Sequence, residues 1–258
     1  MNFLEKLYDL NQKVAVVTGA TGQLGTKITN ALKACGCAVI GLDAKLNPAH
    51  QIDGVDYREL DITNKDAVIK TFDAVAEKYG RFDILINNAG VSTFDPFEKR
   101  EESEIDRVMD INIKGTFFCI QAFVNLYDSR KYSNGAAIVN IGSFYGVVSP
   151  DFRIYTDTPR KSPEIYGATK AGVIQMTKYF GVHLADRGIR CNAVSPGGIF
   201  NPETPQGPEF RAHYSFRCPM KRMANDDEMI GAVLYLAGGA SSYTTGHNIV
   251  VDGGFSCW

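Results

Sequence analysis

The sequence predicts a single α/β domain built on a doubly wound parallel sheet, with helices on both faces. Short, continuously apolar runs alternate with helical stretches along the whole chain. Strands that are continuously apolar, rather than alternating, are typical of a parallel sheet covered on both sides. The length of 258 residues agrees with this, because single α/β domains commonly reach about 250 residues. No linker or repeat divides the chain, so we expect one domain over residues 1–258.

The first strand is predicted at residues 13–18, a β-branched run that ends at Gly19. A helix is predicted over 23–35, where apolar residues recur at helical spacing. The same alternation continues toward the end of the chain. It predicts strands at 37–43, 82–87, 136–141, 189–195 and 248–252, and helices at 66–79, 101–127, 163–187 and 226–236.

Two segments interrupt this alternation, residues 149–163 and 200–219. Both are rich in proline and polar residues. In doubly wound folds, the loops at the carboxyl ends of the strands build the binding site. We therefore expect these two segments to be substrate loops.

Charge and cysteine content argue against several classes of protein. The 27 basic and 29 acidic residues give a net charge of −2, without the basic field expected of a protein that binds nucleic acid or an anionic membrane. No apolar run approaches the roughly 18 residues of a membrane span, and the first residues lack the order of a signal peptide. The six cysteines have neither disulfide-framework nor zinc-site spacing, and the four histidines are isolated. We therefore expect a cytoplasmic protein with a small-molecule substrate and no metal.

A glycine-rich turn joins the first strand to the first helix, with the sequence TGATGQLG at residues 18–25. Glycine lets backbone N–H groups approach a pyrophosphate, and the helix N-terminus adds partial positive charge. Asp43 ends the second strand, 24 residues after Gly19. A carboxylate there accepts hydrogen bonds from the adenosine ribose and repels a 2′-phosphate, which favours NAD over NADP. Lys45 nearby weakens that preference and leaves NADP open.

Tyr166 and Lys170 are four residues apart in a predicted helix, so their side chains share one face. An ammonium group beside a phenol favours the phenolate and is expected to lower the pKa of Tyr166 from about 10. The pair therefore predicts a general acid–base.

These motifs occur in order with the sequence NNAG at 87–90, Asn112 and Ser143, and with them the chain resembles the short-chain dehydrogenase/reductase family, which has a Rossmann-type fold. The resemblance covers essentially the whole chain and includes NAVSPG at 192–197 and DGG at 252–254. It implies a homotetramer or homodimer.

The resemblance implies a role for each matching residue. Tyr166 would exchange a proton with the substrate hydroxyl or carbonyl, and Ser143 would hold and polarise that oxygen. Lys170 would tune Tyr166 and bind the nicotinamide ribose, while Asn112 would anchor a proton-relay water. The cofactor-binding residues implied are Gly19, Thr21, Gly22, Gln23, Leu24, Asp43, Asp61, Ile62, Asn88, Ala89, Gly90, Tyr166, Lys170, Pro196, Gly197, Ile199 and Asn201.

The turn departs from the family pattern, because Gln23 stands where the middle glycine belongs. The spacing T-G-x-x-G-x-x-G is that of the extended branch, which includes nucleotide-sugar epimerases and dehydratases. Extended members usually carry an additional substrate lobe and lack the NNAG and SPG sequences, so we assign the classical branch. The Gln23 side chain must then point away from the phosphates or replace the lost contact.

The interval from Ser143 to Tyr166 is longer than is usual in the family, and the excess lies in residues 149–163. This insertion carries Arg153, Arg160 and Lys161. We hypothesise that one or more of them binds an anionic group of the substrate; the alternative is a solvated surface loop. The candidate substrate-binding residues are Ser143, Tyr145, Arg153 and Arg160.

The function expected is transfer of hydride between NAD(P) and a secondary alcohol or ketone. A polar, basic insertion and few aromatic residues in the substrate loops favour a sugar- or polyol-derived substrate over a steroid. Two alternatives are a sugar or nucleotide-sugar epimerase or dehydratase that recycles its NAD, and a catalytically silent NAD-binding regulator. An enoyl reductase is disfavoured, because that branch spaces its tyrosine and lysine farther apart.

Overall fold

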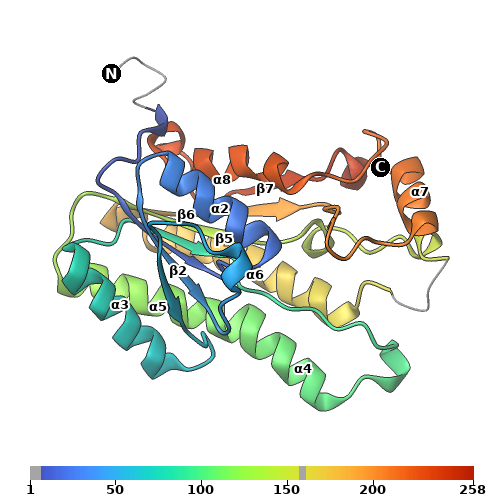
Figure 1. Ribbon diagram of the computed structural model, residues 1–258, viewed down its shortest axis with the longest axis horizontal. Helices are drawn as coiled ribbons and strands as arrows, with labels where there is room; N and C mark the ends of the chain where they lie inside the picture. The colour runs from blue at the N-terminus through green and yellow to red at the C-terminus, as the bar shows by residue number, and fades with distance from the viewer. Residues whose placement is uncertain (1–6, 157–160) are drawn as a thin grey trace.

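The computed structural model describes residues 7–156 and 161–258, and over these residues seven parallel strands form one sheet in the order β3-β2-β1-β4-β5-β6-β7 (Figure 1). Because β1 lies between β2 and β4, the strand order reverses beside β1. Ligands bind at this point in doubly wound sheets. The strands are β1 (Val14–Thr18), β2 (Ala38–Asp43), β3 (Asp56–Glu59), β4 (Ile84–Asn87), β5 (Ala136–Ile141), β6 (Ile189–Pro196) and β7 (Asn248–Val251).

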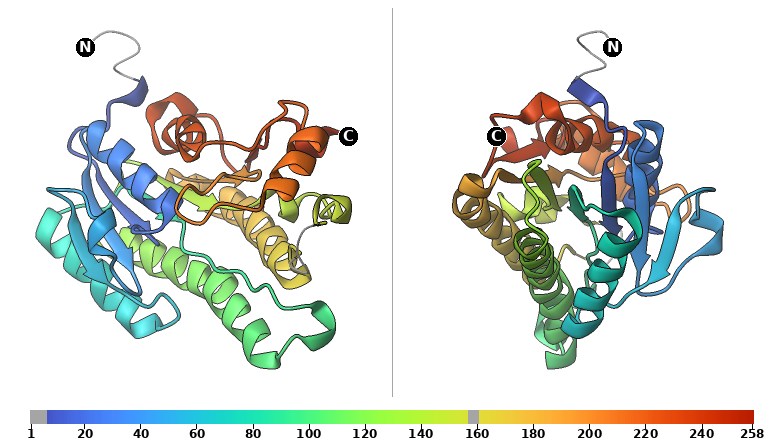
Figure 2. Two further views of the ribbon diagram at one scale, coloured as in Figure 1. Left: turned by 45° about the vertical axis from the view of Figure 1, so that its right-hand side comes forward. Right: turned by 90° about the vertical axis from the view of Figure 1, so that its left-hand side faces the viewer.

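Helices cover both faces of this sheet, as Figure 2 shows from two sides. The apolar runs are buried on both sides, since Val14 and Val16 face one core and Ala15 and Val17 face the other. One core holds side chains of α3 and α5, the other those of α2 and α8. The α-helices are α2 (Gln23–Ala34), α3 (Lys65–Tyr79), α4 (Glu102–Met109), α5 (Thr116–Ser129), α6 (Glu164–His183), α7 (Pro208–Arg217) and α8 (Ile230–Ala237).

The doubly wound parallel fold predicted from the sequence is confirmed, with two elements missed. Strand β3 has the sequence DYRE, which lacks an apolar run because it lies at the edge of the sheet beside β2. Helix α7 lies inside the predicted loop 200–219, and it is mostly polar, with Tyr214 as its buried anchor. Polar edge and surface elements give little periodic signal.

The predicted helix 101–127 is interrupted. Helix α4 ends at Met109, a π-helical segment runs over Asp110–Gly115, and α5 begins at Thr116. Such π-helical turns often occur at functional sites. The other helices agree with prediction to within a few residues, apart from the 3₁₀ turns that end α6 at Ala185–Arg187 and precede α8 at Asp226–Met229. In the described part of the chain, none of the helices combines the length and apolar character required to span a membrane.

The glycine-rich turn depends on glycine at particular positions. Gly19 has φ +62°, and a Cβ there would lie 2.8 Å from the Cα of Ala89. A Cβ on Gly25 would lie 1.9 Å from the carbonyl oxygen of Gly19, whereas one on Gly22 would meet that oxygen only at 3.4 Å. The turn is therefore packed too closely for a side chain at 19 or 25 but not at 22.

Gly25→Ala is expected to destabilise the protein by more than about 2 kcal/mol, because its methyl group would overlap the backbone at Gly19. Gly22→Ala is the matched control and is expected to change stability by less than about 1 kcal/mol. Urea unfolding of the two variants measures the difference. Equal stabilities would contradict the packing argument.

Candidate active site

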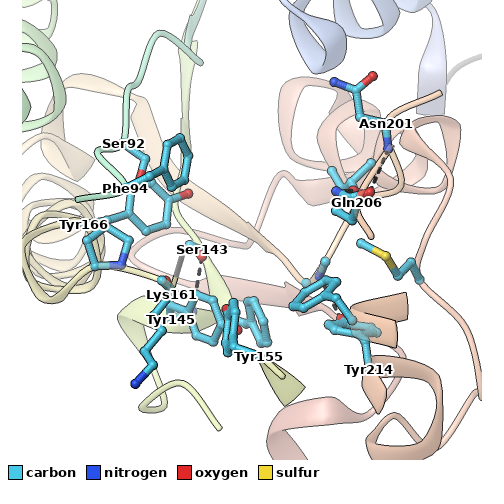
Figure 3. A pocket seen from close by; sticks show the side chains of 18 of the residues that line it. Ser92, Phe94, Ser143, Tyr145, Tyr155, Lys161, Tyr166, Asn201, Gln206 and Tyr214 are labelled. Atoms are coloured by element: carbon cyan, nitrogen blue, oxygen red, sulfur yellow. Dashed lines mark hydrogen bonds between the residues drawn. The ribbon is translucent and has the colours of Figure 1, made fainter. Parts of the chain in front are cut away.

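Ser143 and Tyr166 come together at the carboxyl end of β5. Ser143 directly follows this strand region and caps a 3₁₀ turn, where its Oγ accepts the Tyr145 N–H at 3.2 Å (Figure 3). Tyr166 lies in the first turn of α6, and its side chain is hydrogen-bonded to Ser143. The two hydroxyl groups can therefore act on one substrate oxygen.

Lys170 is buried one turn further along α6. Its ammonium group donates to the carbonyl oxygen of Ile141 at 2.8 Å and lies over the Tyr166 ring, 5.6 Å from its centroid. Burial lowers the pKa of Lys170 to about 8. An amine so held can bind a ligand hydroxyl beside the Tyr166 ring.

The expected effect of Lys170 on Tyr166 is not what the structure shows. Burial is the largest influence and raises the pKa of Tyr166 above its ordinary value, while the hydrogen bond from Ser143 acts in the lowering direction. Lys170 directs its charge at the Ile141 carbonyl and the face of the ring. The group that favours the phenolate form of Tyr166 is therefore the Ser143 hydroxyl.

Asn112 lies in the π-helical segment and is buried. Its amide nitrogen donates to the Val91 carbonyl at 2.9 Å and to the Thr169 hydroxyl at 3.0 Å, and its Oδ1 accepts the Val91 N–H at 2.8 Å. The side chain thus joins the loop after β4 to helix α6. Its role in holding a relay water stays a prediction.

The expected cofactor residues line two neighbouring cavities. One, of about 360 Å³, runs from the glycine-rich turn past Asp43 and Asp61 to Gly90. The other, of about 230 Å³, runs from Gly90 past Tyr166 and Lys170. Together they include all the residues predicted to bind cofactor except Thr21 and Asn201: Gly19, Gly22, Gln23, Leu24, Asp43, Asp61, Ile62, Asn88, Ala89, Gly90, Tyr166, Lys170, Pro196, Gly197 and Ile199.

Hydrogen bonds among the predicted cofactor residues stabilise the walls of these cavities. Thr21 donates its N–H and its hydroxyl to Oδ2 of Asp43, at 3.0 and 2.8 Å. Asn88 donates from Nδ2 to the carbonyl oxygens of Thr18 and Gly19. The carboxylate that the sequence assigned to the ribose is therefore positioned by the glycine-rich turn itself.

Gln23 points toward the loop after β6. Its Nε2 donates to the carbonyl oxygen of Phe200 at 2.8 Å and lies 3.4 Å from Oδ2 of Asp226. The side chain is thus engaged with another segment while it also lines the 360 Å³ cavity. Which of the two expected outcomes applies to the phosphates stays a prediction.

Asn201 lies in the lining of a larger cavity and outside the two that hold the other cofactor residues. Its Oδ1 accepts the N–H groups of Glu203 and Thr204, and its Nδ2 donates to the Thr204 hydroxyl. Its amide therefore stabilises its own loop, and its role in binding cofactor stays a prediction.

The larger cavity has a volume of about 790 Å³ and opens onto Ser143 and Tyr166. Both predicted substrate loops line it, the first through Tyr155 and Lys161–Pro163 and the second mainly through Asn201 and Thr204–Gly207. Ser143 and Tyr166 also line the 230 Å³ cavity, so they stand where the two spaces meet.

Aromatic side chains form much of this lining. Tyr155, Phe210 and Tyr214 come from the two predicted substrate loops, so the expectation that these loops have few aromatic residues is wrong. The Tyr145 hydroxyl is 2.9 Å from that of Tyr155, and Figure 3 shows both rings on the same side of the cavity. Hydroxyl and amide groups accompany the rings. The aromatic lining residues are Phe94, Phe144, Tyr145, Tyr155, Tyr166, Phe210 and Tyr214.

The basic residues of the insertion do not lie as hypothesised. Arg153 pairs with Asp151 through two contacts of 2.8 Å, its side chain is 86% exposed, and it does not line the cavity. A carboxylate two residues away satisfies the guanidinium locally, so its assignment to substrate is corrected. Arg160 lies outside the described residues. Lys161 lines the cavity, with its amine over the Phe152 ring.

Two contacts near the site had no signal in the sequence. The Arg100 guanidinium is buried and donates to Glu164, two residues before Tyr166, at 3.0 and 3.3 Å. His50, which looks isolated in the sequence, contacts both Thr21 and Glu203. In both cases the partner is distant along the chain, so neither local spacing nor composition reveals it.

Comparison with known proteins adds to this geometry. The family profile described as "Enoyl-(Acyl carrier protein) reductase" matches residues 19–256. A 3-oxoacyl-(acyl-carrier-protein) reductase of Thermotoga maritima is 35% identical, covering 95% of this chain and 98% of that protein. A D-arabinitol 2-dehydrogenase (ribulose-forming) of Candida tropicalis is 32% identical, covering 97% of this chain and 95% of the relative. The structure of a short chain dehydrogenase from Leptospira borgpetersenii with bound NAD+ is 34% identical and superposes with a TM-score of 0.88, covering 99% and 96% of the two chains.

Lys170→Met is expected to stabilise the fold at neutral pH. The folded-state pKa of about 8 lies below the ordinary 10.5, so burial of the charged amine destabilises the fold below pH 8, and this effect disappears once the amine is neutral in both states. The loss of the donor to Ile141 offsets part of the gain. We expect the free energy of unfolding to rise by roughly 1–3 kcal/mol at about pH 7, with a smaller difference at about pH 10.

Urea unfolding at the two pH values measures this difference. Lys178→Met, on the exposed side of the same helix, is the matched control and is expected to show no such pH-dependent gain. A Lys170→Met variant less stable than the wild type at neutral pH would refute the argument.

Proposed function

The chain belongs to the short-chain dehydrogenase/reductase family of NAD(P)-dependent oxidoreductases that act on CH–OH groups, and within it we propose that this protein is an NAD-preferring dehydrogenase of sugar- or polyol-derived secondary alcohols. The observation that carries the proposal is the position of Ser143 and Tyr166. These residues line both the cavity of the cofactor residues and the larger cavity, so an oxygen held between them faces both spaces.

The residues of the cleft fit a nicotinamide dinucleotide. Gly19, Gly22 and Gly25 line the 360 Å³ cavity beside the N-terminus of α2, where backbone N–H groups can bind a phosphate. Asp43 ends β2 and lines the cavity, with one carboxylate oxygen held by Thr21, and the other would accept from a ribose hydroxyl. A bound nicotinamide supplies the hydride or accepts it.

The protein's own residues would perform the proton chemistry. In alcohol oxidation Tyr166 would remove the hydroxyl proton, and in ketone reduction it would return one. Ser143 would donate to the developing oxyanion and so stabilise charge in a site with little water. Lys170 would hold the ribose hydroxyl next to Tyr166, since its ammonium group is fixed by Ile141.

A polyol substrate is supported by the lining of the larger cavity and by one relative. Hydroxyl groups accompany the aromatic rings in its lining, among them those of Ser92, Ser143 and Ser162. Such groups can pair with several substrate hydroxyls while the rings contact the carbon chain. The similarity to a D-arabinitol 2-dehydrogenase agrees with this.

The alternatives find less support. The relatives reported above are dehydrogenases or reductases by name, which gives no support to an epimerase, a dehydratase or a silent regulator. The four-residue spacing of Tyr166 and Lys170 in α6 argues against enoyl reduction. We also propose a homo-oligomer, since exposed apolar side chains such as Met109, Phe117 and Tyr179 lie on α4, α5 and α6. Sedimentation of the purified protein as a monomer would contradict this.

A substrate panel tests the activity directly. Pentitols, hexitols, their ketoses and sugar acids, each with NAD and NADP, would be compared with a 3-oxoacyl thioester and a hydroxysteroid by absorbance of the reduced cofactor. We expect a polyol or ketose to have the highest kcat/KM, with Tyr166→Phe lowering it by about 10²- to 10⁴-fold. Binding of NADH to this variant, followed by fluorescence, should change little.

Tyr155→Phe is the matched control, because its hydroxyl bonds to Tyr145 in the same cavity and is expected to affect KM more than kcat. Preference for the thioester or steroid would overturn the polyol assignment. Full activity of Tyr166→Phe would overturn the mechanism.

Asp43→Asn is expected to reduce the preference for NAD. The amide keeps an acceptor oxygen for Thr21 but removes the charge that repels a 2′-phosphate. The ratio of kcat/KM for NAD to that for NADP should fall at least about ten-fold. Asp61→Asn, a carboxylate of the same cavity, should change the ratio less. An unchanged ratio in Asp43→Asn would show that Asp43 does not select the cofactor.

A further inference from the structure

Two hydrogen-bonded contacts join the cofactor side of the molecule to one short segment of the substrate cavity, residues 200–207, here called the substrate-side loop. Gln23 donates to the carbonyl oxygen of Phe200 at 2.8 Å. His50 lies 2.9 Å from Oε1 of Glu203 through its Nε2. Both contacts span more than 150 residues of sequence, so they exist only when the loop is docked.

The loop transmits these contacts to the cavity. The N–H of Glu203 donates to Oδ1 of Asn201 at 2.9 Å, and the N–H of Asn201 faces Gln206, whose Nε2 donates to the carbonyl oxygen of Ile199 at 3.0 Å. Asn201, Gln206 and Ile199 line the 790 Å³ cavity. Movement of Glu203 would therefore displace side chains that face the substrate.

The hydrogen-bond partners of His50 define its protonation state. The ring belongs to the 3₁₀ turn Pro48–His50 after β2, and its Nδ1 lies 2.7 Å from the carbonyl oxygen of Thr21. A carbonyl oxygen and an ionised carboxylate can only accept. Both ring nitrogens must therefore carry a proton, and the form that satisfies both contacts is the imidazolium.

The surroundings favour this charged form. The hydrogen bond to Thr21 and then that to Glu203 raise the pKa of His50 above its ordinary value of 6.5, while burial opposes them. Glu203 is the charged group in contact with the ring. Asp43 does not contact the ring, but its Oδ2 accepts from Thr21, the residue that His50 contacts. Lys45 is the cation between Asp43 and His50 in the sequence. Because the pKa of His50 is raised, the stabilisation that its contact with Glu203 gives to the docked loop is present at low pH. This stabilisation is lost as the pH rises through the raised pKa.

We propose that His50 is a positioning residue whose imidazolium docks the substrate-side loop onto the glycine-rich turn, so that the substrate is bound more tightly at mildly acidic than at alkaline pH. This inference rests on the proposed function of the cavity. It adds a link between the two halves of the site: Thr21, which accepts from His50, also holds Asp43 on the cofactor side. Gln23 is the pH-independent counterpart, because an amide does not titrate.

Hydrogen–deuterium exchange of the amides of residues 200–207 tests loop docking without a substrate. Protection factors, corrected for intrinsic exchange, would be compared at about pH 6 and about pH 9. For the wild type we expect protection to fall by about two- to five-fold at the higher pH, the size expected of a partly exposed ion pair. In His50→Gln and in Glu203→Gln, the protection factors should be as low at both pH values as those of the wild type at about pH 9.

Two further variants separate this role from general destabilisation. His183→Gln, at the far end of α6, should keep the wild-type pH dependence. Gln23→Ala should lower protection at both pH values while keeping the ratio between them. Equal protection of the wild type at the two pH values, or an unchanged ratio in His50→Gln, would overturn the proposal.

Kinetics with the best substrate of the panel supply the functional readout. KM of the wild type should rise about two- to five-fold over the same pH range, and KM of His50→Gln should be high throughout, with kcat changed less than KM. If the protection of the loop changes with pH but KM of the wild type does not, the proposal is also overturned. If the panel yields no substrate, the exchange experiment still decides loop docking, so failure of the proposed function is distinguishable.

Discussion

The close packing of the glycine-rich turn against the end of β4 is the constraint on which the rest of the site depends. Gly19 and Gly25 leave no space for a Cβ, and Asn88 donates to the carbonyl oxygens of Thr18 and Gly19. This packing brings β1 and β4 together where the strand order reverses. The cavity at the carboxyl ends of these strands is lined by three glycines of the turn, Gly19, Gly22 and Gly25, and glycine permits the close backbone approach that a phosphate-bearing ligand needs.

The proposed catalytic centre lies further along the same edge, where polar groups such as Ser143 and Lys170 are buried. Burial lowers the pKa of Lys170, although its ammonium group still donates to the carbonyl oxygen of Ile141. Asn112 and Arg100 are hydrogen-bonded to helix α6, Asn112 through Thr169 and Arg100 through Glu164. Such burial is typical of active sites, which retain groups that would be unfavourable elsewhere.

The fold, and the placing of Ser143, Tyr166 and Lys170 around one cavity, were predictable because their signals are local. A buried parallel strand has to be apolar throughout, and Tyr166 and Lys170 share a helix face because they are four residues apart. The expectations that failed concerned charge and long-range contact. Arg153 forms an ion pair with Asp151, two residues away, and does not line the cavity. His50 contacts Glu203, which is more than 150 residues away in the sequence.

The sequence by itself determined the doubly wound architecture and the family, and it predicted the candidate catalytic residues, since each depends on spacing within one element or on motifs in a set order. Only the tertiary structure decided what Gln23 contacts, why the pKa of Tyr166 is raised, and which polar side chains face the substrate cavity. The physical reason is that a side chain's pKa and hydrogen bonds depend on burial and on the groups within a few ångströms. Around this site those groups come from segments far apart in the chain.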